Sequence, residues 1–427
     1  MRVQREIGCA VTPKTFVIAV HGTRGDVEPC AAAALELQRR GHRVRMAVPP
    51  NLTAFVESVG LGPAATYGVD SQKQLEADIF KDWWKFQNPM TVLRRSREYV
   101  TEGWSEMNDT LVATAKDVDL ILTGTTYQEV AANVAEALHI PLAALHYFPC
   151  RENGQVLPVP LPRPVLHAGW STAEWAHWKV LSKAENAQRM ALGLPPAKTR
   201  AIRRIVEGGA LEIQAYDEVF FPGLTEEWQG VRPLVGSLSL ELPAADDDDV
   251  LAWIAAGTPP IYFGFGSMPV ESPADAVAMI TAVCADLGER ALISSGVWDV
   301  ADLPRSENVK LVGAVNHSKV FPGCRAVVHH GGAGTVAASV RSGVPTVVLW
   351  VSADQPVWAG KVNRLGVGVA RRFSSTDARS LTKALRTAMS PACQERAREA
   401  ATRMTSPVRA ASTTADLLER AAGRGRD

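Results

Sequence analysis

Residues 327–335 read Val-Val-His-His-Gly-Gly-Ala-Gly-Thr, and Asp354-Gln355 follow about twenty residues later. The β-branched residues predict a buried strand, and the small residues after them let the backbone come close to a ligand. Residues 336–340 predict the first turns of a helix. Free N–H groups at a helix start, beside a His and a Thr, form an anion pocket suited to a diphosphate. A Gly-rich turn without a ligand is the alternative interpretation.

The bulk properties indicate a soluble globular protein of more than one domain. A chain of 427 residues is too long for one ordinary core. The 45 basic and 45 acidic residues give zero net charge, which argues against a nucleic-acid partner. The six cysteines form no Cys-x-x-Cys motif and are expected to be reduced thiols in a cytoplasmic enzyme. Apolar runs fall short of the ~18 residues that span a bilayer, and we leave open a peripheral contact with a membrane surface.

The first half of the chain repeats a strand–helix–strand pattern. After residues 1–14, which we interpret as a frayed extension rather than a signal peptide, strands are expected at 15–20, 44–48, 119–123 and 141–145. Pro29 is expected to open a helix that stops at Gly41, and residues 128–138 predict another helix. This alternation predicts an α/β fold with a parallel, Rossmann-like sheet.

The second half repeats the pattern after a break. Four consecutive aspartates, Asp246 to Asp249, are expected to form a solvated linker and a helix N-cap; a metal site is the alternative. Strands are expected at 260–265, 291–295, 309–312, 326–328 and 344–349, with a helix at 274–287. We divide the chain into an extension (1–14), a first domain (15–222), a linker (223–249), a second domain (250–405) and a C-terminal helix and tail (406–427) that folds back on the first domain.

Two helical segments of the first half, 81–110 and 168–190, are rich in tryptophan. Ordinary core packing is one interpretation. The other is that some of the indoles line a cleft for a large apolar partner.

Four loops are expected at the carboxyl ends of strands, where ligands of parallel α/β folds bind. They span residues 21–28, 264–268, 330–335 and 350–355. Two Rossmann-like domains facing each other would bring these loops to one cleft.

The motifs together resemble those of the inverting glycosyltransferases with the two-domain GT-B fold, a family that includes plant and animal glucuronosyl and glucosyl enzymes. The pattern is most similar to the actinobacterial branch that glycosylates antibiotics, glycolipids and glycopeptidolipids, with sterol glucosyltransferases as relatives. The resemblance covers nearly all of residues 15–420 and rests on Gly22-Thr-Arg-Gly-Asp-Val-Glu-Pro29, Tyr262-Phe-Gly-Phe-Gly-Ser267, His329-His-Gly-Gly-Ala-Gly-Thr335 and Ala353-Asp-Gln-Pro356.

This resemblance implies a donor nucleotide-sugar site in the second domain. The diphosphate would be held by His330 and by the backbone of Gly332, Ala333, Gly334 and Thr335, with a further contact from Ser267. Asp354 and Gln355 would hydrogen-bond the sugar hydroxyls. The backbone at Val315 would meet the base, and Trp298 would flank it.

Asp26 is the catalytic residue that the resemblance implies, a general base that takes the proton of the acceptor hydroxyl. A carboxylate is a weak base in water and would need a closed, dehydrated site. The alternative is that Asp26 caps the following helix, and both roles can coexist. His21 is given only a supporting role.

The resemblance implies no metal and no cofactor, because the helix start and His330 would meet the charge of the leaving diphosphate. The sequence has no Asp-x-Asp motif at a strand end, which agrees. Plant members of the family bind the ribose hydroxyls with a Glu where this chain has Ala338. We therefore favour a dTDP-sugar over a UDP-sugar.

The leading hypothesis is transfer of a hexose to a hydroxyl of an apolar lipid, glycopeptidolipid or natural product. A catalytically silent member that activates another transferase is the second, although the presence of Asp26, His330, Asp354 and Gln355 argues against it. A dinucleotide-dependent oxidoreductase would need Gly-x-Gly-x-x-Gly after the first strand, and residues 21–26 do not fit that motif.

Overall fold

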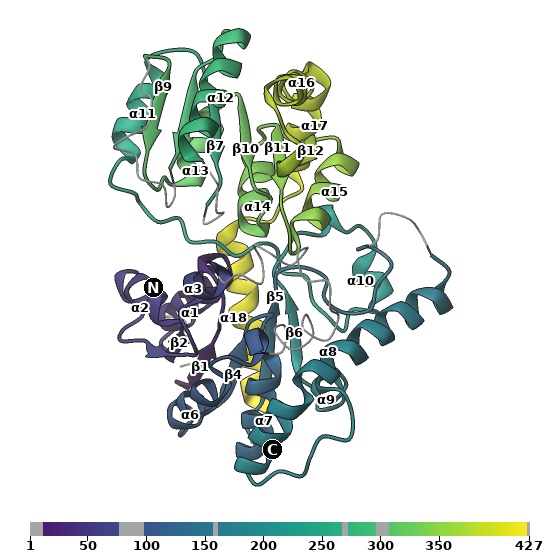
Figure 1. Ribbon diagram of the computed structural model, residues 1–427. Helices are drawn as coiled ribbons and strands as arrows, with labels where there is room; N and C mark the ends of the chain where they lie inside the picture. The colour runs from purple at the N-terminus through teal and green to yellow at the C-terminus, as the bar shows by residue number, and fades with distance from the viewer. Residues whose placement is uncertain (1–11, 77–97, 157–160, 267–271, 296–306, 425–427) are drawn as a thin grey trace, which may run out of the picture. The chain divides into compact units, whose positions relative to one another are not determined.

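The computed structural model describes residues 12–76, 98–156, 161–266, 272–295 and 307–424. The chain divides into two compact units, one of residues 1–145, 171–213 and 411–427, the other of residues 146–170 and 214–410. The predicted linker, 223–249, falls inside the second of these units. Each unit is built on a parallel β-sheet flanked by helices, which confirms the predicted α/β class (Figure 1).

The first sheet has the strand order β3-β2-β1-β4-β5-β6. Its strands are β1 (Thr15–Ala19), β2 (Arg43–Val48), β3 (Ala65–Thr66), β4 (Leu120–Thr123), β5 (Leu142–His146) and β6 (Leu211–Gln214). The accompanying helices are α1 (Arg24–Arg39), α2 (Thr53–Ser58), α3 (Ser71–Glu76), α6 (Trp104–Thr114), α7 (Gln128–Leu138), α8 (Arg163–Ala191) and α9 (Ala201–Glu207). The order reverses between β1 and β4, which pair in parallel, and ligands of open parallel sheets commonly bind at such a point.

The second sheet repeats this topology in the order β12-β11-β10-β7-β8-β9. Its strands are β7 (Ile261–Gly264), β8 (Ala291–Ser294), β9 (Val309–Val312), β10 (Ala326–His329), β11 (Thr346–Trp350) and β12 (Gly368–Arg372). The helices that follow the first sheet in the chain are α10 (Leu224–Glu227), α11 (Asp247–Ala255), α12 (Pro273–Leu287), α13 (His317–Val320), α14 (Ala333–Arg341), α15 (Gln355–Leu365), α16 (Ala378–Ala388), α17 (Pro391–Thr402) and α18 (Pro407–Gly423). The order reverses between β7 and β10.

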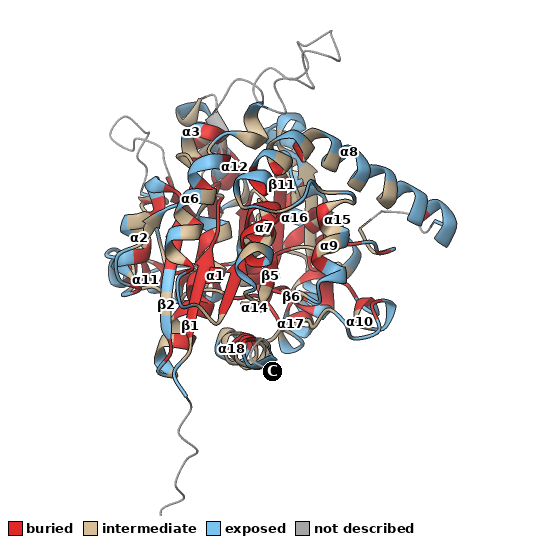
Figure 2. Cartoon of the chain, turned by 90° about the horizontal axis from the view of Figure 1, so that it is seen from below, coloured by how far each residue is buried: buried red, intermediate tan, exposed pale blue. Residues whose placement is uncertain are grey.

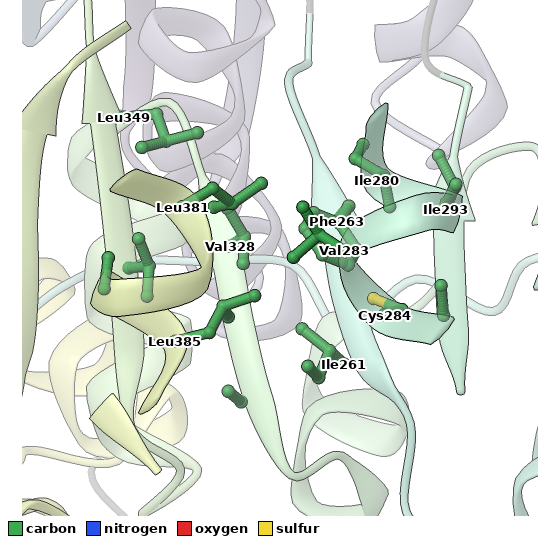
Figure 3. Close-up of a cluster of buried hydrophobic side chains, with 14 of the residues drawn as sticks. Ile261, Phe263, Ile280, Val283, Cys284, Ile293, Val328, Leu349, Leu381 and Leu385 are labelled. Carbon is green, nitrogen blue, oxygen red and sulfur yellow. The ribbon is translucent and has the colours of Figure 1, made fainter. Parts of the chain in front are cut away.

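One core cluster of the second unit forms where one face of this sheet meets α12 and α16. Phe263 of β7 and Val328 of β10 are opposite each other in the register, and both are fully buried. Val283 of α12 and Leu385 of α16 close over them (Figure 3). Such strands are buried on both faces, which explains their nearly continuous apolar sequences.

Helix α1 begins five residues earlier than predicted. Thr23 is its N-cap: its Oγ1 accepts a hydrogen bond from the Gly25 N–H (3.2 Å), and Asp26 Oδ2 accepts one from the Thr23 N–H (2.7 Å). This reciprocal capping box satisfies the first orphan donors of the helix. The prediction that Pro29 opens the helix is wrong, because Pro29 lies inside it and forfeits one helical hydrogen bond.

The aspartate run after the first sheet also differs from expectation. Asp247 is buried and accepts hydrogen bonds from the N–H groups of Ala244 and Asn316, both at 2.9 Å. The solvated-linker interpretation is therefore wrong for this residue. Asp248 and Asp249 are exposed in the first turn of α11, where the helix dipole favours negative charge.

The C-terminal helix α18 folds back on the first unit, as predicted. Arg40 donates hydrogen bonds to Asp416 (2.6 Å) and Glu419 (3.2 Å), and Lys14 Nζ donates to the carbonyl of Glu419 (2.8 Å). Among the helices that the structure describes, none combines the length and the apolarity needed to cross a bilayer.

Candidate functional site

Three of the four predicted loops follow the switch-point strands β1, β7 and β10, and the fourth, at residues 350–355, follows β11 beside β10. In the second unit, Gly266 follows β7 and His330 follows β10. In the first unit, His21 follows β1, and its carbonyl accepts a hydrogen bond from Thr126 Oγ1 (2.5 Å) beyond the end of β4. Open parallel sheets bind ligands at these points.

The turn between β10 and α14 is shaped by glycine. Gly331 has a φ of +93°, and a Cβ there would lie 2.7 Å from Cγ1 of Val348. Gly332 is the N-cap of α14, and among the described residues no side chain caps the helix and no acid lies in its first turn. The N–H groups of the first turn are therefore available to an anion, and the helix dipole adds to the attraction.

His330 lies against the backbone of two glycines. A Cβ on Gly266 would be 3.1 Å from the ring Cε1, and one on Gly332 would be 2.7 Å from Nε2. The ring Nδ1 is buried and has no hydrogen-bond partner among the described residues. Burial lowers the pKa of His330 to about 4, so the ring is neutral near pH 7 and can donate one hydrogen bond.

His329 shapes the same turn, and the sequence reasoning gave it no role. Its Nδ1 accepts the Gly331 N–H at 3.0 Å, so the ring proton is on Nε2. The side chain is fully buried, and burial holds the pKa of His329 well below its usual range. The pair of adjacent histidines at the strand end was the sequence signal that could have indicated a role for His329. Consecutive strand residues point in opposite directions, so the two rings have different surroundings.

The loop between β11 and α15 meets the first turn. Gln355 Oε1 accepts hydrogen bonds from the N–H groups of Val351 (2.7 Å) and Ser352 (3.2 Å). A Cβ on Gly331 would lie 3.5 Å from the Cβ of Gln355, so the structure brings these two predicted donor loops together. The Gln355 amide nitrogen bonds to no described residue, which leaves it available to a ligand.

Asp354 is oriented by a residue that the sequence reasoning missed. Its Oδ2 accepts a hydrogen bond from Trp358 Nε1 at 2.8 Å. Burial raises the pKa of Asp354, and the Trp358 N–H partly opposes that rise. Trp358 is fixed by edge-on contacts with Phe220 and Phe221, with ring centres 5.4 and 5.5 Å away. The sequence signal that could have identified this contact is the spacing of four residues, which places Asp354 and Trp358 on one helix face.

The structure describes only some of the remaining residues that were predicted to line the nucleotide site. Val315 and Ala338 are half-buried and pack against one apolar cluster of the second unit. Ser267 and Trp298 lie outside the described residues. Within the described part of the chain, no three His, Cys, Asp or Glu side chains gather as a possible metal site.

The first unit holds Asp26 and His21. The Asp26 carboxylate lies against Gly22, where no side chain would fit, and its Oδ2 also accepts from Thr23 Oγ1 (3.1 Å). Its capping role is thus visible, whereas its role as a base stays a prediction. His21 Nε2 donates to the Val69 carbonyl (3.0 Å), and burial lowers the pKa of this ring.

Comparison with known proteins then identifies the family. Residues 16–150 match the glycosyltransferase family 28 N-terminal domain, and residues 281–420 match the C-terminal domain of erythromycin biosynthesis protein CIII-like proteins. An uncharacterized glycosyltransferase of Mycobacterium tuberculosis is 55% identical over 96% of this chain and 100% of its own length. The chain belongs to the glycosyltransferases.

Two further proteins are similar to this glycosyltransferase over most of its length. The vancomycin aglycone glucosyltransferase of Amycolatopsis orientalis is 31% identical over 89% of this chain and 91% of its own. The crystal structure of the glycosyltransferase VinC in complex with dTDP covers 96% of this chain and 100% of its own, at 19% identity and a TM-score of 0.64. The fold is therefore that of the GT-B glycosyltransferases. Asp26 lies in the N-terminal match, and the loops at His330 and Asp354 lie in the C-terminal match.

Proposed function

We propose that this glycosyltransferase transfers a hexose, with inversion, from a dTDP- or UDP-sugar to a hydroxyl of an apolar lipid, glycopeptidolipid or natural product. The observation that carries the donor assignment is the uncapped start of α14 beside the buried, neutral ring of His330. The dTDP bound to VinC and the aglycone acceptor of the vancomycin enzyme support the two substrate classes.

The donor diphosphate accepts hydrogen bonds from His330 and from the N–H groups of Gly332, Ala333, Gly334 and Thr335, with Ser267 adding a contact. These donors are fixed before the reaction, so they stabilise the negative charge that grows on the leaving diphosphate. Asp354 and the Gln355 amide hold the hydroxyls of the sugar, and the base contacts Val315 and Trp298. The proposal needs no metal ion.

In the chemical step, the acceptor oxygen attacks the anomeric carbon of the donor sugar. The bond between this carbon and the diphosphate oxygen breaks at the same time. The nucleoside diphosphate leaves with the bonding electrons, and the acceptor's proton passes to the Asp26 carboxylate. A single displacement of this kind inverts the anomeric centre.

The deoxyribose of dTDP suits a pocket without a carboxylate at the ribose. Ala338 presents a methyl group, and it packs on an apolar cluster together with Val315. We therefore propose dTDP-sugars as preferred donors, with glucose and 6-deoxysugars both compatible.

A thermal-shift screen against dTDP-, UDP- and GDP-sugars tests the donor class, because at one fixed ligand concentration a tighter ligand raises the melting temperature more. We expect dTDP-sugars to stabilise the protein most and His330→Ala to abolish the shift. A GDP-sugar preference, or no shift with any nucleotide sugar, would refute the donor assignment.

Asp26→Asn separates the base from the cap. An Asn side-chain oxygen can still accept the Thr23 N–H bond, so α1 keeps its cap while the proton acceptor is lost. We expect turnover to fall by about 10²- to 10⁴-fold with nucleotide binding retained. Unchanged turnover would remove Asp26 from the chemistry. Should wild type show no transfer yet stimulate another transferase, the activator hypothesis would replace ours.

A further inference from the structure

Helix α8 carries an apolar and basic stripe along its exposed side. The stripe consists of Val165, Thr172, Trp175, Lys179, Lys183 and Met190, all exposed. Their spacings of three, four or seven residues put them on one helix face. Val165, Trp175 and Met190 are 53%, 53% and 63% exposed, and no other described element has more than one large hydrophobic residue this exposed.

From Leu181 onward, the opposite side of α8 packs onto the protein: Leu181 is buried, and the buried Gln188 accepts a hydrogen bond from Trp104 Nε1 (3.0 Å). Between Arg163 and His177, Leu166 is the one buried residue. The stripe is therefore not a face awaiting the core of this chain. Figure 2 shows the exposed colour along much of α8.

The acidic residues of α8 lie away from the stripe. The acids of the helix, Glu174 and Glu185, pair with Arg200 and Arg204 rather than joining the stripe. Both stripe lysines are exposed, and Lys179 Nζ lies 5.6 Å from the ring centre of Trp175. Its charge thus lies over the face of an exposed indole.

We propose that the α8 stripe is a docking surface for an anionic lipid bilayer. Helices with an indole, aliphatic side chains and lysines on their free side lie in the headgroup region, with the apolar groups inserted and the ammonium groups at the phosphates. The stripe from Val165 to Met190 would extend about 37 Å along the surface at 1.5 Å per residue. A second copy is a poorer occupant, since pairing two stripes would bring lysines together without any acid.

Co-sedimentation with vesicles tests the proposal on the full chain. We expect binding to vesicles of phosphatidylcholine with 30% phosphatidylglycerol, and little binding to phosphatidylcholine alone, with ~30% chosen to mimic an anionic leaflet. Lys179→Glu with Lys183→Glu should weaken binding at least ~25-fold, from about fivefold for each lysine lost. Val165→Ser with Trp175→Ser should weaken it roughly tenfold or more, through lost apolar insertion.

Control variants change exposed lysines and exposed valines elsewhere. Lys116→Glu with Lys383→Glu alters the same charge at two other exposed lysines, and Val231→Ser with Val408→Ser removes two valines that are 68% and 79% exposed. Both controls should bind like wild type, and all variants should keep the wild-type melting temperature. Equal loss in stripe and control variants would overturn the proposal. Absence of vesicle binding would also overturn it. So would analytical ultracentrifugation that shows a dimer for the wild type and a monomer for the variant with Val165→Ser and Trp175→Ser. None of these readouts depends on sugar transfer.

Discussion

The Asp354 carboxylate accepts a hydrogen bond that Trp358 Nε1 donates across a turn of α15 at 2.8 Å. Trp358→Phe removes that donor but leaves an aromatic ring among Phe220 and Phe221. If Asp354 binds the sugar, KM for the nucleotide sugar should rise roughly tenfold, while affinity for dTDP alone stays unchanged. The pKa of Asp354 should also rise further, since the N–H bond favours the ionised form, so the acid limb of kcat/KM should shift to higher pH.

Trp228→Phe is the matched control for this prediction. Trp228 belongs to the same aromatic cluster, and its Nε1 donates to the Glu152 carbonyl at 2.8 Å, away from Asp354. This variant should keep the wild-type KM and pH profile. An equal loss of nucleotide-sugar and dTDP affinity in Trp358→Phe would mean that the tryptophan serves the packing of the unit only.

Ala338 gives a second prediction for a single side chain. Ala338→Glu would place a carboxylate where a ribose 2′-hydroxyl can bind it, so the ratio of UDP- to dTDP-sugar affinity should increase about tenfold. Calorimetric titration of both donors measures this ratio. Ala338→Gln, with the same length but no charge, should change the ratio less. A drop in both affinities with an unchanged ratio would place the ribose elsewhere.

At the level of the element, two glycines in the segment from β10 to the first turn of α14 differ in whether the structure has room for a side chain. Gly331 has a left-handed φ and no room for a methyl group, whereas a Cβ on Gly334 would meet nothing within 4 Å. Gly331→Ala should destabilise the protein by roughly 1–3 kcal/mol and weaken nucleotide binding. Gly334→Ala should stabilise it by up to about 1 kcal/mol, because alanine favours the helix. Urea denaturation of both variants checks the pair, and equal signs would contradict this account of the turn.

For the whole molecule, buried neutral histidines predict acid sensitivity. Burial lowers the pKa values of His21, His329 and His330, that of His330 to about 4. A folded-state pKa below the unfolded value of about 6.5 means that the unfolded chain binds protons that the folded chain excludes. Stability is thus retained above pH 6.5 and falls as the pH drops toward 4, by about 3 kcal/mol for His330.

His330→Gln isolates that contribution, because glutamine does not titrate. The difference in unfolding free energy between pH 7 and pH 4.5 should be smaller in the variant by about 2–3 kcal/mol. Urea midpoints at the two pH values measure it. The same pH dependence in variant and wild type would show that the His330 ring protonates freely in the folded protein.

The local sequence pattern was enough to predict most of the strands and helices. Apolar runs bounded by turn residues located the central strands to within two residues, and the helices expected at 128–138 and within 406–427 correspond to α7 and α18. The strands β3, β6 and β12, all at sheet edges, were missed because their sequences lack a clear apolar run. Partial exposure accompanies this in β3 and β12, whereas β6 is mostly buried.

By itself, the sequence determined the two parallel sheets and the glycine turn at His330, because strand periodicity and the need for a side-chain-free backbone are local requirements. Only the tertiary structure decided which groups meet at a distance. It placed Gln355 next to Gly331, and it buried Asp247 where the carboxylate accepts hydrogen bonds from two backbone N–H groups. It also showed that α1 begins before Pro29, at a capping box. These outcomes depend on the packing of residues that are remote in sequence, or on competition between local signals. They therefore cannot be predicted from one segment of the chain.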